Sequence, residues 1–149
     1  MVADDAEGRP SLNWMNRLIT TGERDGKGTV DVKRNGLRIV ADAARIFGLR
    51  AGVTSTNTSD RLTALTRLGV LSQDFVATVC TAYDEMLDIL LNHQVEQYRS
   101  GKEPDKLVAP EDLSPPAREA LRVAMRAVKR LQDTLQNEIG GQPYLPGVD

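Results

Sequence analysis

The chain has 149 residues, a formal net charge of -2, and 40% apolar, 27% charged and only 4% aromatic residues. This length and composition predict one globular domain with an aliphatic core, and they exclude a transmembrane helix, because no apolar run approaches the roughly 18 residues that one needs. The acidic balance argues against nucleic acid as a partner, and the N-terminus lacks the features of a secretion signal, which predicts a cytoplasmic location.

Residues 1–36 precede the predicted helical bundle. Residues 1–10 are small, polar and acidic and predict a disordered lead-in. Residues 11–36 predict a short helix followed by a flexible glycine-rich loop. A brief alternation at Val30 and Val32 allows at most a short extended segment, so the strand signals are too few to predict a sheet.

Residues 37–140 are predicted to form an all-α antiparallel bundle of about four main helices, followed by a tail over 141–149. The first helix covers residues 37–49, which are apolar except for one narrow charged stripe. A shorter helix follows over residues 60–68, after a segment rich in capping side chains.

Two long helices complete the predicted bundle. Ser72 is a favourable N-cap for a helix that runs to near Gly101. Ser114 and Pro115 begin the last helix in the favoured order of cap and proline, and Gly140 ends it.

The third predicted helix changes character near its end. Its packing face continues through Leu87 and Leu90 and then meets Gln94, with His93 on the shoulder of that face. Two interpretations remain open. The bundle end could be polar because it opens to solvent or holds hydrogen-bonded core residues, or these side chains could line a cleft.

Charged residues on two helices also allow two interpretations, exposure to solvent or a role in binding. Arg38, Asp42 and Arg45 share one face of the first helix and could form a solvated salt-bridge ladder or face a cleft. The last helix carries a basic side that could be solvated or could bind phosphate or an acidic partner. Along this side lie Arg118, Arg122, Arg126 and Lys129, with Arg130 adjacent.

The residues that usually carry catalysis are scarce. One histidine and one cysteine cannot supply a conventional zinc site, and Cys80 lies in an apolar pattern that predicts a small buried hydrophobe. Because the usual catalytic motifs are absent too, the chain is not expected to be an enzyme on its own.

Several segments contain polar and small residues in a recognisable order and spacing: Asp31, Lys33, Gly36, Asp42, Ala44, Arg45, Thr56, Asn57, Thr58, Arg61, Leu62, His93 and Gln94. In this order and spacing they resemble the nucleotidyltransferase substrate-binding domain family. This is the C-terminal helical part of bacterial proteins that also carry CBS or cyclic-nucleotide-binding modules and a nucleotidyltransferase domain related to protein-PII uridylyltransferase. Two positions depart from the family's pattern, Asn35 in place of a glycine and Asn92 in place of an arginine.

The resemblance implies a non-catalytic substrate-binding or regulatory domain of a uridylyltransferase-like enzyme involved in signal transduction. The implied substrate-binding residues are Lys33, Arg45, Asn57, Thr58, Arg61, His93 and Gln94. Of these, five are expected to converge on one cleft, namely Arg45, Asn57, Arg61, His93 and Gln94. The catalytic domain is expected elsewhere, in cis or in trans, because no Gly-Ser turn with paired aspartates is present. Mg²⁺ and a nucleoside triphosphate are expected only with that domain, and no cofactor or metal with this chain.

The acceptor implied by the resemblance is a protein or a small molecule. The rival hypothesis is a helical interaction or dimerisation module without a ligand site, in which polar residues fix the register and the chain forms a homodimer.

Overall fold

The computed structural model describes residue 20 and residues 22–140. The boundaries at 1–10 and 141–149 and nearly all of the short helix expected within 11–20 therefore lie outside the described residues. The elements are β1 (Gly22–Arg24), β2 (Lys27–Asp31), the π-helix η1 (Lys33–Leu37), α2 (Arg38–Ala51), α3 (Thr58–Arg67), α4 (Gln73–Arg99), β3 (Leu107–Val108), the 3-10 helix η2 (Pro110–Asp112) and α5 (Pro115–Gly140).

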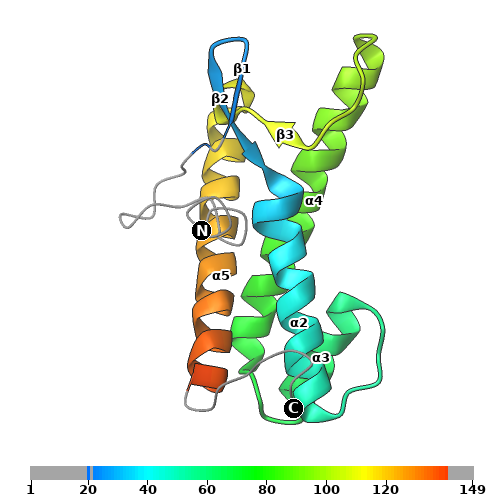
Figure 1. The fold of residues 1–149 in the computed structure, drawn as a ribbon, viewed down its shortest axis with the longest axis vertical. Coiled ribbons are helices and arrows are strands. Elements are labelled where there is room, and N and C mark those ends of the chain that lie inside the picture. The colour runs from blue at the N-terminus through cyan, green and yellow to red at the C-terminus, as the bar shows by residue number, and fades with distance from the viewer. Residues whose placement is uncertain (1–19, 21, 141–149) are drawn as a thin grey trace.

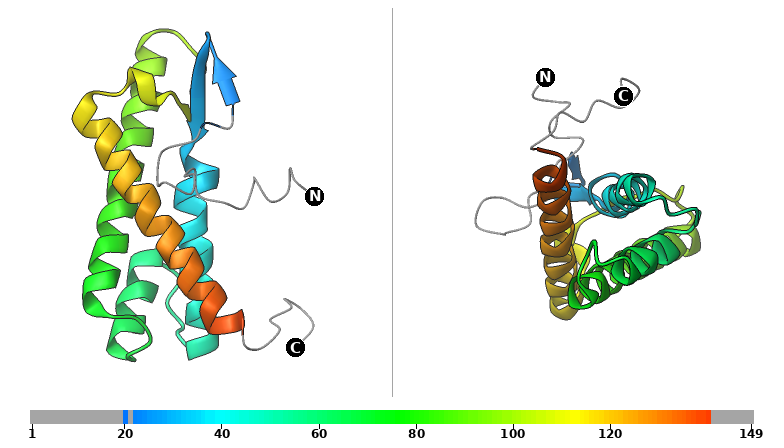
Figure 2. Two further views of the ribbon diagram at one scale, coloured as in Figure 1. Left: turned by 90° about the vertical axis from the view of Figure 1, so that its left-hand side faces the viewer. Right: turned by 90° about the horizontal axis from the view of Figure 1, so that it is seen from below.

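The helices form the predicted bundle. The long helix α4 runs antiparallel to α2 and α5, and the short helix α3 lies at the end of the bundle where α4 begins (Figure 1). Viewed along the long axis, α5, α4 and the pair α2–α3 occupy three sides of a triangle (Figure 2). The mainly helical fold class is therefore confirmed.

Local capping sets most helix ends where the sequence predicts them. Ser72 Oγ accepts a hydrogen bond from the Phe75 amide at 3.2 Å and begins α4. Gly52 ends α2 with a φ of 75°, a left-handed conformation that favours glycine. Asn57 caps α3, which therefore begins two residues before the predicted position.

The core is aliphatic and lies between the three sides of the triangle. The helix α5 supplies its centre, because Leu121, Val128 and Leu131 have no exposed surface. None of the helices within the described part of the chain combines the length and apolarity that a membrane crossing requires. The largest fully buried side chains are Leu62, Leu65, Met86, Leu121, Met125, Leu131, Val30, Val32, Val40, Val79, Val108 and Val128.

The prediction that no sheet forms is wrong, because β1, β2 and β3 pair in that order as a small antiparallel sheet. Asp25 and Gly26 make the two-residue turn between β1 and β2, with φ values of 54° and 78°, as a type I′ hairpin requires. β3 comes from the connection between α4 and α5, and pairs Val108 with Val30. The sheet thus ties this late connection to the start of the bundle.

The π-helix η1 joins the sheet to α2 and lies very close to two other helices. A Cβ atom on Gly36 would lie 2.5 Å from Met86 Sδ on α4 and 3.2 Å from Met125 Cε on α5. Both methionines are fully buried. Only a glycine fits here without displacing them, so Gly36 allows η1 to lie directly against α4 and α5.

Candidate functional site

The polar end of α4 fastens the connection that follows it. His93 Nε2 lies 2.8 Å from Asp105 Oδ1, and Gln94 Nε2 donates to the Asp105 carbonyl oxygen at 3.1 Å. Gln97, which is buried, accepts a hydrogen bond from the Asp105 amide at 2.8 Å. The polar residues on the packing face are therefore hydrogen-bonded to the backbone and side chain of one aspartate.

The Asp105 carboxylate is also held from the hairpin. Arg24 Nη1 donates to Asp105 Oδ2 at 2.7 Å, while Arg24 Nη2 donates to the Leu107 carbonyl oxygen at 2.8 Å. Burial alone would raise the pKa of Asp105, but hydrogen bonds from His93 and from the Leu107 amide, together with the charge of Arg24, lower it from 3.8 to about 2. We call Arg24, His93, Gln94, Gln97 and Asp105 the Asp105 clamp.

The depressed pKa of Asp105 predicts a specific pH dependence of stability. Its ionised form stabilises the fold fully above the unfolded value of 3.8, and this contribution disappears as the pH falls toward about 2. Wild type should therefore lose more stability between these pH values than Asp105→Asn, as measured by urea unfolding. Parallel pH curves for the two proteins would show that the clamp does not depend on the charge of Asp105.

The predicted site residues of α3 have local structural contacts. Asn57 Oδ1 accepts a hydrogen bond from the Asp60 amide at 3.2 Å and caps α3, which starts at Thr58. Arg61 Nε donates to the Ser55 carbonyl oxygen at 2.8 Å, which holds the α2–α3 connection. These contacts give Asn57 and Arg61 structural roles in the α2–α3 connection.

The structure does not bring the predicted residues into one cleft, so that expectation is wrong. His93 lies near the end of α4, whereas Arg61 lies on α3 at the opposite end of the bundle (Figure 1). Arg45 is exposed and pairs with Asp42 at 3.5 Å. Whether these residues bind substrate stays a prediction.

A different set of polar residues does meet in one place. An open groove of about 560 Å³ lies between the η1–α2 junction and α4, and it contains two of the predicted residues, Lys33 and Gln94. We call it the basic groove. Its lining residues are Lys33, Arg34, Leu37, Arg38, Ala41, Tyr83, Leu90, Gln94 and Lys106.

The basic groove has an excess of positive charge. Its lining includes four cationic side chains and no carboxylate. Lys33, Arg38 and Lys106 are exposed, and no carboxylate among the described residues forms an ion pair with any of them. Three cations that share one groove without a counter-charge raise the local potential and favour an anionic ligand.

Neighbouring structure holds these cations in place. Asp31 Oδ1 accepts a hydrogen bond from the Arg34 amide at 2.8 Å, which orders the first turn of η1. The Val32 amide donates to the Lys106 carbonyl oxygen at 3.2 Å, and Lys106 directly follows the clamped Asp105. The sheet and the Asp105 clamp therefore bring Lys106 to the groove that begins at Lys33.

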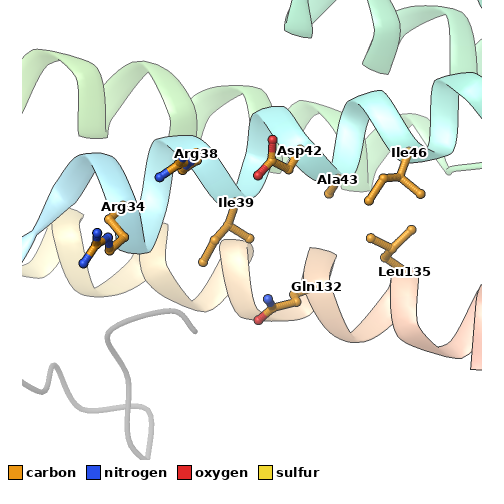
Figure 3. A pocket seen from close by; sticks show the side chains of 8 residues that line it. All are labelled: Arg34, Arg38, Ile39, Asp42, Ala43, Ile46, Gln132 and Leu135. Atoms are coloured by element: carbon orange, nitrogen blue, oxygen red, sulfur yellow. The ribbon is translucent and has the colours of Figure 1, made fainter. Parts of the chain in front are cut away.

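A second groove lies on the other side of the same cations. It separates α2 from α5, with Arg34, Arg38, Asp42 and Ile46 on one wall and Gln132 on the other (Figure 3). Arg34 and Arg38 line both grooves, so they form a ridge between them. One part of the charged stripe on α2 therefore faces grooves, as one of the two interpretations expects.

Arg38 and Lys106 are groove residues that the sequence-based site prediction omits. The charged stripe on α2 was a signal for Arg38. Nothing local indicates Lys106, because its place depends on the pairing of β3 with β2.

Other candidate features are largely engaged within the fold. On α5, Arg118 donates to the Pro110 carbonyl oxygen, Arg122 pairs with Glu119, and Arg130 lies over the Phe75 ring at 4.6 Å from its centroid.

The cysteine is not activated as a nucleophile. Burial, and then the charge of Asp84, raises the pKa of Cys80, which disfavours the reactive thiolate. In residues 20 and 22–140 no group of three or more acidic, histidine or cysteine side chains could hold a metal ion.

Comparison with known proteins identifies a family. A family model described as "Putative nucleotidyltransferase substrate binding domain" matches residues 1–139. The match spans the hairpin, η1 and the helices, and so includes both the basic groove and the Asp105 clamp. No curated protein and no solved structure matches the chain.

Proposed function

Because the chain belongs to the nucleotidyltransferase substrate-binding domain family, we propose that it binds a phosphate-bearing substrate for an active site that a separate catalytic domain supplies. The observation that carries this proposal is the basic groove, in which Lys33, Arg38 and Lys106 lack carboxylate partners among the described residues. The catalytic domain, in cis or in trans, would bring the metal ion and the carboxylates that perform the transfer.

The groove suits the binding of phosphate groups. Two lysines provide compact, flexible point charges, and Arg38 provides a planar guanidinium that can donate two hydrogen bonds to one phosphate. Tyr83 and Leu90 add an apolar wall on α4 that could contact a base or another uncharged part of the ligand. In this role the chain contributes no nucleophile, but it holds the substrate and offsets its negative charge.

A titration of the chain with tripolyphosphate, UTP, ATP and uridine tests this proposal. The triple variant Lys33→Gln/Arg38→Gln/Lys106→Gln should bind the phosphate-containing probes at least about tenfold more weakly, because each charge-assisted contact contributes about 1.5–3 kcal/mol. Isothermal titration calorimetry at low ionic strength measures this loss. Tighter binding of a nucleotide than of tripolyphosphate would assign the groove to the nucleotide, and equal binding would assign it to phosphate alone.

The control changes the same charge elsewhere on the surface. Arg50→Gln/Arg67→Gln/Arg126→Gln removes three exposed cations that lie outside the basic groove. This variant should bind every probe as wild type does. Equal losses in the two triple variants would indicate general charge attraction, and no binding of any phosphate probe to wild type would contradict the proposal.

A further inference from the structure

The second half of α4 exposes an apolar stripe that the bundle does not cover. Leu91, Val95 and Tyr98 have the spacing i, i+4, i+7, which places them on one face of the helix. They remain 49%, 47% and 77% exposed. Isolated exposed apolar residues are ordinary, but three in register on one helix face form a surface suited to another helix.

Opposite charges flank this stripe along the helix. Asp88 lies three residues before Leu91 and Arg99 four residues after Val95, so both lie on the same face. Both are exposed, and neither forms an ion pair with another described residue. The face is thus acidic toward the start of α4, apolar in the middle and basic at its end.

We propose that this face of α4 binds the same face of a second copy of the chain. Two such helices can pack antiparallel about a two-fold axis that crosses the exposed face of α4 at the level of residue 93. This arrangement places Leu91 against the partner's Val95 and Asp88 beside the partner's Arg99. The symmetry repeats each contact, as an isologous interface requires. A parallel arrangement would instead place like charges together, so the charge pattern selects the antiparallel pair.

The partner of this face of α4 is a second copy of the chain because the face is complementary to itself. Its acidic end matches its own basic end, and its apolar middle needs only another apolar middle. The interface is limited to about half of one helix, which is below the usual area of a permanent dimer. We therefore expect a weak dimer with a Kd of roughly 10 μM to 1 mM. The basic groove has a different lining and takes no part.

A charge-exchange experiment tests this interface on the full chain. Sedimentation velocity should show wild type shifting from monomer to dimer as its concentration rises through that range. Asp88→Arg alone and Arg99→Asp alone should each stay monomeric, because each homodimer then contains two like-charged pairs. An equimolar mixture of the two variants should dimerise again, since both pairs in the mixed dimer are then of opposite charge.

Two further variants keep the test decisive. Leu91→Gln should weaken dimerisation at least tenfold without altering the charge, and Arg67→Asp on α3 should leave it unchanged. Circular dichroism confirms that each variant is folded. A wild type that stays monomeric at about 1 mM, single variants that dimerise like wild type, or a mixture that stays monomeric would each overturn the proposal.

Discussion

Replacing Asp105 with alanine is expected to lower the free energy of unfolding by about 2–3 kcal/mol, whereas the same change at Asp112 should alter it little. Both carboxylates pair with a cation of the β1–β2 hairpin, Asp105 with Arg24 and Asp112 with Lys27. They differ in what else they contact. Asp105 also accepts hydrogen bonds from His93 and from the Leu107 amide, and it is 35% exposed against 54% for Asp112.

Urea unfolding of wild type and the two variants measures this contrast. The alanine at position 105 would leave His93 and the Leu107 amide without their acceptor, and that loss accounts for most of the expected effect. Equal destabilisation by the two substitutions would show that the connection is held by hairpin ion pairs in general. In that case the polar end of α4 would need another explanation.

Replacing Gly36 with alanine is expected to make the protein about 1–3 kcal/mol less stable than replacing Gly48 with alanine. Both glycines are buried, helical and free of positive φ, so the substitution reduces the flexibility of the unfolded chain equally at both sites. A Cβ atom on Gly48 would meet Val53 Cβ at 3.6 Å, an ordinary contact, whereas one on Gly36 would approach Met86 Sδ to 2.5 Å. The difference therefore measures the cost of displacing the buried methionines.

The two glycine variants also connect packing to binding. Alanine at position 36 should move η1 away from α4 and weaken the binding of tripolyphosphate to the basic groove, while alanine at position 48 should leave that binding unchanged. Thermal unfolding and calorimetric titration of the same two proteins give both results. If the two variants had the same stability and affinity, the close approach of η1 would not set the position of Lys33.

Sequence patterns predicted those parts of the fold that depend on neighbours along the chain. The Ser72 cap and the Gly52 terminus depend on hydrogen bonds within a few residues, so helix ends fell within one or two residues of their predicted places. The Asp25–Gly26 dipeptide is itself typical of a hairpin turn. It does not predict a hairpin here because the strands that flank it lack a long apolar alternation.

The basic groove and the Asp105 clamp could not be predicted in the same way. Lys33 and Lys106 are far apart in sequence, and the pairing of β2 with β3 together with the Asp105 clamp places them on one groove. His93 and Gln94 were recognised as unusual, but their partner Asp105 lies in a connection that has no periodicity of its own. The positive charge of the groove arises from residues that meet only in the tertiary structure, so helical periodicity alone does not predict it.

The pairing of Val30 with Val108 bears on the order of folding. It closes a loop that contains α2, α3 and α4, whereas the connection between α4 and α5 covers only residues 100–114, so these two helices can associate earlier. Closing this long loop costs conformational entropy, and the contacts that offset the cost form only when most of the chain is folded. A chain that has formed its helices but has not closed the sheet would have Lys33 and Lys106 apart. If the basic groove binds phosphate as proposed, this binding should therefore emerge in the last step of folding.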